Sequence, residues 1–539
     1  MAGLARRLQK KSYTNNDNKD AIMANPNLFQ TLTGKLPPLA DARNAEGAPA
    51  YLLSPRHRLA QYAATGCLND TYYADAGDQL ATVLELGRDV DARFIAQAAI
   101  YARERGYMKD MPALLAAVLA ARGAPELTPV FERVIDNGRM VRNFVQIVRS
   151  GVTGRKSLGT RPKKLVQRWL NTADEKTLLA AAVGTAPSLA DIVRMVHPRP
   201  AEAWRTAFFA WLIGKPYDAA ALPQAVRDFE TYKRDRGAAL PEVPFQMLTA
   251  LDLADADWAA LALRGGWHML RMNLNTFARH GVFELPGMMD AIAARLRDPQ
   301  AIARARVLPY QLMAACRAGV DLPAPVRAAL ADALEIALAN VPQLAGRVVV
   351  CPDVSGSMSG PVTGWRRGAT SQVRCIDVAA LVAAALARRN PGTVVLPFEQ
   401  DVVGVALDEN DTIMRNAERL AAIGGGGTNC SAPLAWLNRQ HVRADVVVFV
   451  SDNESWIDAR RGGRSTATLD EWRRFKRRNP AAKLACIDIT PHGMVQAAED
   501  ADVLNVGGFS DAVFDILAAF AAGQLAAGHW VGEIESIAL

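Results

Sequence analysis

The sequence predicts a molecule of two parts, an α-solenoid of paired helices followed by a doubly wound α/β domain. As far as about residue 340, apolar residues recur at spacings of three and four between short separators with Gly, Pro, Asp or Asn. Beyond about residue 346, runs of β-branched residues alternate with helical segments. We therefore expect a flexible tail at 1–22, a helical-repeat domain at 23–345 and an α/β domain at 346–539.

The helical half has its clearest apolar periodicity in segments 91–108, 110–123, 126–151, 177–184 and 323–341. Short loops between antiparallel helices favour helix pairs stacked side by side, which is the architecture of an α-solenoid. No strict sequence period accompanies these segments.

The second half begins with the buried-strand pattern RVVVCPDVS at 347–355. Further strands are expected at 392–398, 444–455, 482–490 and 502–507, and helices at 374–390, 413–424, 432–441, 469–479 and 511–523. Strands that alternate with helices predict a parallel sheet, whose ligands lie beyond the carboxyl ends of its strands.

Oxygen-bearing side chains follow three elements of this half. Asp353, Ser355 and Ser357 come after the first strand, Thr428 lies in the glycine-rich loop GGGGTNCS, and Asp452 ends another strand. The first three alone are better explained by an ordinary polar turn. Together, two carboxylates and three hydroxyls suit Mg²⁺, or Mn²⁺, with water at the remaining positions.

A basic run at 139–168 holds nine basic residues and no Asp or Glu, although the net charge of the whole chain is only +7. Such a surface attracts phosphates, whereas a solvated helix face usually mixes both signs. The candidate nucleic-acid-binding residues are Arg139, Arg142, Arg149, Arg155, Lys156, Arg161, Lys163, Lys164 and Arg168. His197, between Arg194 and Arg199, is a further candidate that spacing alone would assign a structural role. A second, mixed cluster lies at 473–478.

Other functional classes find little support. The seven histidines are scattered, HExxH and GxSxG are missing, and the serines near Asp353 have no His close in sequence, so we do not expect an enzyme. Six widely spaced cysteines fit free thiols and a cytoplasmic protein. The chain has no apolar run long enough to span a membrane and no secretory signal at its start.

The motifs DVSGS, GGGGTN and VSDNES resemble the metal-ion-dependent adhesion site of von Willebrand factor A domains. The resemblance implies that Ser355, Ser357 and Thr428 ligate a cation through their hydroxyls. It further implies that Asp353 and Asp452 bind the cation directly or through water. Because the hydroxyls are neutral, the cation would remain able to take an acidic ligand.

Four segments of the helical half resemble, in order, motifs of the TROVE domain of the Ro ribonucleoprotein family, bacterial type. They are HRLAQYAATGCLNDTYYA at 57–74, GTRPKKLVQRWLN at 159–171, DIVRMVHPRP at 191–200 and WHMLRMNLNTFARHGVF at 267–283. This implies a closed ring of HEAT-like repeats bridged by the A-like domain. Such proteins bind Y RNA on an outer basic surface and single-stranded 3′ ends of misfolded RNA in a central hole. Lys163, Lys164, Arg168 and His197 lie in matching motifs, whereas charge alone selects Arg155 and Lys156.

Two hypotheses follow. In the first, the chain is a monomeric RNA-binding protein of noncoding RNA quality control, and a separate exoribonuclease performs any trimming. In the second, it is a metal-dependent protein-interaction module that scaffolds a complex through its A-like domain.

Overall fold

The computed structural model describes residues 38–65, 68–305, 307, 309–339, 341–365, 373–457, 465–525 and 528–539. Residues 40–539 form one compact unit. The tail predicted at 1–22 lies outside the described residues, as does Cys67, and the other five cysteines are free thiols. Within the described residues, no helix combines the length and the apolar character that crossing a membrane requires.

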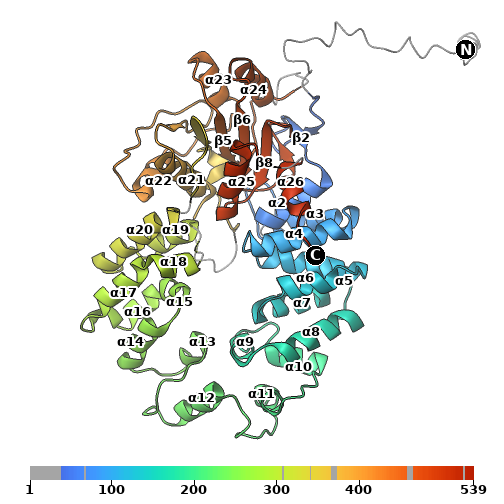
Figure 1. Cartoon of the computed structure of the whole chain (residues 1–539), viewed down its shortest axis with the longest axis vertical. Coiled ribbons are helices and arrows are strands. Elements are labelled where there is room, and N and C mark those ends of the chain that lie inside the picture. The colour runs from blue at the N-terminus through green and yellow to red at the C-terminus, as the bar shows by residue number, and fades with distance from the viewer. Residues whose placement is uncertain are drawn as a thin grey trace, which may run out of the picture. The chain divides into compact units, whose positions relative to one another are not determined.

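Helices follow one another from residue 55 to residue 338, in an arc that Figure 1 shows in blue to yellow. They are α2 (Pro55–Thr65), α3 (Ala76–Asp89), α4 (Ala92–Glu104), α5 (Asp110–Arg122), α6 (Leu127–Val134), α7 (Gly138–Ser150), α8 (Thr160–Thr172), α9 (Glu175–Ala181), α10 (Leu189–Val196), α11 (Ala203–Ile213), α12 (Gln224–Arg234), α13 (Phe245–Leu248), α14 (Asp255–Arg264), α15 (Trp267–Met272), α16 (Leu274–Arg279), η1 (Val282–Glu284), α17 (Met288–Arg297), α18 (Pro299–Ala305), α19 (Pro309–Ala318) and α20 (Ala324–Leu338). The stretch expected to be helical at 126–151 contains two helices, because the Asn137 side chain accepts a hydrogen bond from the Met140 amide and begins α7.

A repeat that is hard to see in the sequence becomes visible in the arginines. Several guanidinium groups donate to a backbone carbonyl 33 to 35 residues earlier, near the carboxyl end of a helix. These pairs are Arg122 with Gly87, Arg155 with Ala120, Arg205 with Leu170 and Arg295 with Ala262, at 3.0, 2.6, 2.9 and 2.6 Å. The last carbonyls of a helix have no partner within it and carry partial negative charge, so a cation from the next repeat satisfies both needs.

The second half is a parallel five-stranded sheet in the order β4-β3-β5-β6-β8, with helices around it. Its elements are β3 (Val348–Pro352), η2 (Gly356–Ser359), α21 (Cys375–Arg389), β4 (Val394–Val395), α22 (Ile413–Ala421), α23 (Ala432–Arg439), β5 (Val446–Ser451), α24 (Ala467–Arg478), β6 (Lys483–Asp488), β8 (Val503–Gly507), α25 (Asp511–Ala521) and α26 (His529–Glu535). The strand expected at 392–398 is reduced to β4, although the Leu396 and Phe398 amides still donate to the Val350 and Pro352 carbonyls of β3, at 2.8 and 3.1 Å. The order confirms the doubly wound fold, and its switch point lies where β3 and β5 are neighbours.

The helical array begins against this domain. A hairpin of β1 (Ala42–Arg43) and β2 (Pro49–Leu52), which the sequence pattern did not predict, pairs through β2 with β7 (Met494–Val495). Helices α2 and α4 pack on α26, whose Trp530 is completely buried. The His57 ring also lies 2.8 Å from the Asn505 carbonyl oxygen of β8.

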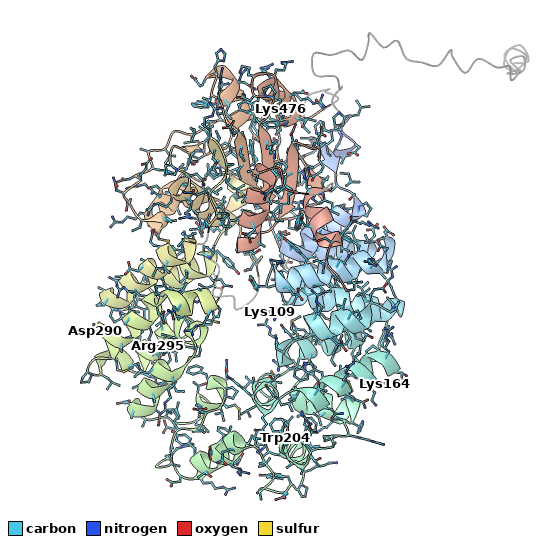
Figure 2. The ribbon with its side chains drawn as sticks, viewed as in Figure 1. Lys109, Lys164, Trp204, Asp290, Arg295 and Lys476 are labelled. Atoms are coloured by element: carbon cyan, nitrogen blue, oxygen red, sulfur yellow. The ribbon has the colours of Figure 1, made fainter. Side chains whose placement is uncertain are left out.

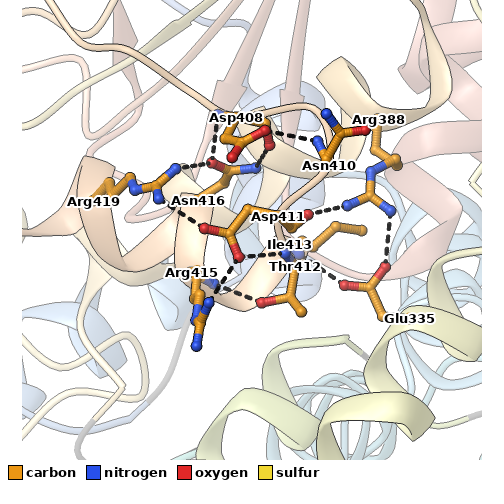
Figure 3. A network of polar contacts seen from close by, with 10 residues as sticks. All are labelled: Glu335, Arg388, Asp408, Asn410, Asp411, Thr412, Ile413, Arg415, Asn416 and Arg419. Carbon is orange, nitrogen blue, oxygen red and sulfur yellow. Dashed lines mark hydrogen bonds and ion pairs between the residues drawn. The ribbon is translucent and has the colours of Figure 1, made fainter.

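The array also ends against this domain, through polar contacts. Arg317 of α19 pairs with the buried Asp377 of α21. Figure 3 shows Glu335 of α20 between Arg388 and the Ile413 amide, at 3.2 and 2.7 Å. With both ends of the array on one domain, the predicted closed ring of helical repeats is confirmed.

Candidate functional site

Three loops meet at the carboxyl edge of the sheet, and we call them the metal loops: residues 353–360, 424–431 and 451–456. Asp353 and Asp452 follow the neighbouring parallel strands β3 and β5, and the Asp353 amide donates to the Val450 carbonyl at 2.9 Å. The glycine-rich loop joins them through a hydrogen bond from the Gly356 amide to the Gly426 carbonyl, at 3.1 Å. The switch point thus collects the loops that the sequence analysis selected.

The oxygen atoms of these loops have the spacing of a small cation's ligands. The hydroxyls of Ser355 and Ser357 lie 3.3 Å apart. Adjacent ligands of an octahedral Mg²⁺ are about 3 Å apart when each lies about 2.1 Å from the ion. Ser357 also lies beside Asp452, and all five predicted ligands are buried. Among the described residues no group of three or more His, Cys, Asp and Glu could hold a metal, so a cation here needs the hydroxyls.

The electrostatics of the metal loops favour a positive ion. Burial, and then the charge of Asp452, raise the pKa of Asp353 to about 7, and burial also raises the pKa of Asp452. Ser451, which the sequence analysis missed, donates to Asp353 at 2.6 Å and orients it. A divalent cation would relieve the repulsion between the two carboxylates, and these residues fit Mg²⁺ or Mn²⁺.

A separate basic groove lies on the helical array. It is a hollow of about 570 Å³ on α8 and the loop before it, and its cationic lining residues are Arg149, Lys156, Lys163 and Lys164. Within the described part of the chain, these four side chains make no hydrogen bond or ion pair. We call this hollow the basic groove. Unpaired cations around a concave surface form a binding site for a polyanion.

The other cations of the basic run divide by their contacts. Arg142, Arg155 and Arg161 donate to backbone carbonyls of Ala181, Ala120 and Ala124, at 2.8, 2.6 and 2.8 Å. Arg168 pairs with Glu132 at 2.6 Å. These four therefore join repeats, whereas Arg139 is exposed and has no such partner among the described residues.

His197 ends α10 in the left-handed conformation with φ 53°, and its side chain is exposed. Gln167 of α8, which lines the basic groove, donates to the neighbouring Val196 carbonyl at 2.6 Å. This contact places His197 next to the groove.

Two basic residues that the sequence analysis missed, Lys109 and His268, lie within electrostatic range of one another although they come from distant helices. Lys109 precedes α5 on the inner side of the array, while Lys164 lies on its outer side (Figure 2). Burial lowers the pKa of Lys109, and Arg139 and Arg103 lower it further. The charge of Lys109 in turn contributes to the lowered pKa of His268 on α15. The only sequence signal for this pair is His268, within the TROVE-like segment 267–283.

The mixed cluster at 473–478 is largely engaged in internal contacts. Lys476 pairs with Asp502 at 2.7 Å, Arg474 with Glu471 at 3.1 Å, and Arg478 donates to Asn438 at 2.7 Å. Within the described residues, Arg477 is exposed and makes no ion pair, so this cluster offers less free charge than the basic groove.

Comparisons with known proteins agree with this division into a helical array and an A-like domain. Residues 347–521 match the family model described as the Ro60 vWA domain. RNA-binding protein RO60 of Deinococcus radiodurans is 26% identical over 524 residues, covering 90% of this chain and 96% of that protein. RNA-binding protein RO60 of Caenorhabditis elegans is 21% identical over 254 residues, covering 44% of this chain and 37% of that protein.

The fold comparison extends over most of the chain. The crystal structure of the Deinococcus radiodurans Ro (RSR) protein superposes with a TM-score of 0.61 at 22% identity, covering 88% of this chain and 100% of that chain. The names of the two sequence relatives are those of RNA-binding proteins and not of enzymes, in agreement with the prediction that this chain is not an enzyme. Together these findings confirm the predicted resemblance to the Ro family along nearly the whole chain.

Proposed function

We propose that the chain is a non-catalytic RNA-binding protein of noncoding RNA quality control. The observation that carries this proposal is the basic groove, where four cations line one hollow and have no partner among the described residues. Lysines and arginines held in this way neutralise phosphates and release their counterions. Both sequence relatives are named RNA-binding proteins, which supports RNA as the ligand.

Two surfaces divide the work in this proposal. The basic groove, with Arg139 and His197 nearby, binds the structured part of a Y RNA. Single-stranded 3′ ends of misfolded RNA enter the central hole, where Lys109 and His268 contact the backbone. Contacts to phosphates rather than to base edges give little sequence preference, which suits a protein that handles many RNAs.

The metal loops serve a second purpose in this proposal. Mg²⁺, or Mn²⁺ when it is available, is bound by Asp353, Ser355, Ser357, Thr428 and Asp452. The bound ion takes one further carboxylate as a ligand. The alternative function, a metal-dependent interaction module, uses the same five residues to capture an acidic partner. We further propose a monomeric, cytoplasmic ribonucleoprotein that passes RNA to a separate exoribonuclease.

Filter binding tests the proposal. The probes are a stem RNA with a single-stranded 3′ tail and the same stem without the tail. We expect Lys163→Glu with Lys164→Glu to weaken binding of both probes by at least tenfold, because reversed charges repel phosphates. The matched control reverses two exposed arginines of the A-like domain, Arg443→Glu with Arg477→Glu, and should bind like wild type. Equal affinity of the groove variant and wild type would refute the proposal.

Sequencing of co-purified RNA tests the class of ligand. We expect small structured RNAs and RNAs with extended 3′ tails to be enriched over their cellular abundance. A sample that merely mirrors cellular abundance contradicts a role in quality control.

A further inference from the structure

The turn of the β1–β2 hairpin is fastened to the metal loops. The Asn44 side-chain amide donates to the Ser455 carbonyl at 2.6 Å, and the Ala45 amide donates to the Glu454 carboxylate at 2.8 Å. The two acceptors lie two and three residues after Asp452 in the chain. Two hydrogen bonds therefore hold the next residue of the turn, Glu46, beside the metal loops.

Polar side chains lead from Glu46 to the predicted ligands. The Tyr73 hydroxyl donates to the Glu46 carboxylate at 3.1 Å, and Tyr73 also lies beside Ser357. Ser357 in turn lies beside Asp452. Glu46 itself lies within electrostatic range of Asp452 and Glu454.

This placement is unfavourable in the absence of a cation, because Glu46 adds a third carboxylate near Asp353 and Asp452, which already repel one another. A side chain on an exposed turn could avoid this repulsion by pointing into water. With a cation the same placement is favourable. Asp353, Ser355, Ser357, Thr428 and Asp452 supply five oxygen ligands, and an octahedral Mg²⁺ takes six.

We propose that Glu46 is the internal acidic ligand of the metal site and takes the sixth position on the cation. This inference rests on the proposed metal site. It means that the ion ties the amino-terminal hairpin to the A-like domain and so fastens one end of the ring. An external acidic partner binds only by displacing Glu46.

Binding of Mn²⁺ to the full-length protein tests the inference, by calorimetry and by water-proton relaxation, which counts the exchangeable waters on the ion. We expect Glu46→Gln to weaken Mn²⁺ binding about tenfold, within the range for residues that support a metal site, and to add one exchangeable water. Glu85→Gln, which removes an exposed carboxylate of α3, is the matched control and should match wild type in both readouts. Tyr73→Phe should weaken binding less than Glu46→Gln, because it removes only the hydroxyl that orients the carboxylate.

The outcomes separate this inference from the metal site itself. If Asp452→Asn abolishes Mn²⁺ binding while Glu46→Gln keeps wild-type affinity and water count, the internal ligand is refuted and the site stands. If wild type binds no Mn²⁺, both are refuted. Hydrogen exchange at residues 42–52 gives a second readout: Mn²⁺ should slow it in wild type, and a rate that Mn²⁺ leaves unchanged would overturn the inference.

Discussion

The basic groove and the metal loops offer opposite kinds of site. The groove is an exposed hollow on the helical array, lined by long cationic side chains that no acidic residue of the described chain neutralises. The predicted ligands of the metal loops are buried oxygen atoms, and the charge of Asp452 lies close enough to raise the pKa of Asp353, after the larger effect of burial. One site is open to a polyanion of any size, whereas the other admits an ion.

This difference indicates that a charged residue can be assigned a role only after its hydrogen-bond and ion-pair partners in the fold are known. Arg155 and Lys156 are adjacent, yet Arg155 donates to a carbonyl of the preceding repeat and Lys156 lines the groove. In the metal loops, Ser451 is not a predicted ligand, but its hydroxyl donates to Asp353 and orients that carboxylate. The two sites should therefore respond independently to mutation.

The largest expected effect is the loss of metal binding in Asp353→Ala. Asp353 contributes one of only two carboxylates among the predicted ligands, so Asp452 and the three hydroxyls that remain should bind Mg²⁺ at least about 100-fold more weakly. Calorimetry with Mg²⁺ measures this loss. RNA affinity of the same variant should equal that of wild type, and a parallel loss of RNA affinity would break the separation between the two sites.

A smaller effect is expected from neutralising the groove with Lys163→Ala and Lys164→Ala. RNA affinity should fall by about tenfold, and the slope of log affinity against log salt should decrease by about 2, one for each lost phosphate contact. Filter binding across a salt series measures both quantities. An unchanged slope would show that these lysines contact no phosphate, and Mg²⁺ affinity serves as the control that should stay constant.

The smallest effect distinguishes the adjacent residues Arg155 and Lys156. Arg155→Ala should cost about 1–3 kcal/mol of unfolding free energy, because it removes a charged donor from the Ala120 carbonyl, and it should change RNA affinity little. Lys156→Ala should do the reverse. Chemical unfolding together with RNA binding checks the pair, and equal effects of the two substitutions would contradict their assignment to different roles.

Much of the fold and of the metal loops was predictable because their signals are local. Two motifs can each be recognised from a few consecutive residues: a buried strand that ends in Asp and a glycine-rich loop that ends in Thr. A parallel sheet then brings the ends of its strands to one edge. The β1–β2 hairpin was not predictable in this way. Its strands are short, and they are stabilised by pairing with β7, more than 400 residues away along the chain.

The division of the basic run was also beyond local sequence patterns. Whether an arginine reaches the end of a helix in the preceding repeat depends on how the repeats stack, and the spacing of 33 to 35 residues becomes visible only once the acceptor carbonyls are known. Lys109 and His268 approach one another only because the array curves back to the domain on which it began. Tyr73 and Ser357 lie close together for the same reason.

The most direct test of the central claim, that the unpaired cations of the helical array bind the RNA, is ultraviolet cross-linking of wild-type protein to a tailed stem RNA, followed by mass spectrometry. We predict cross-linked peptides from residues 149–168 for the stem, and peptides that contain Lys109 or His268 for the 3′ tail. Cross-links concentrated in the metal loops, with none in the basic groove, would contradict the account.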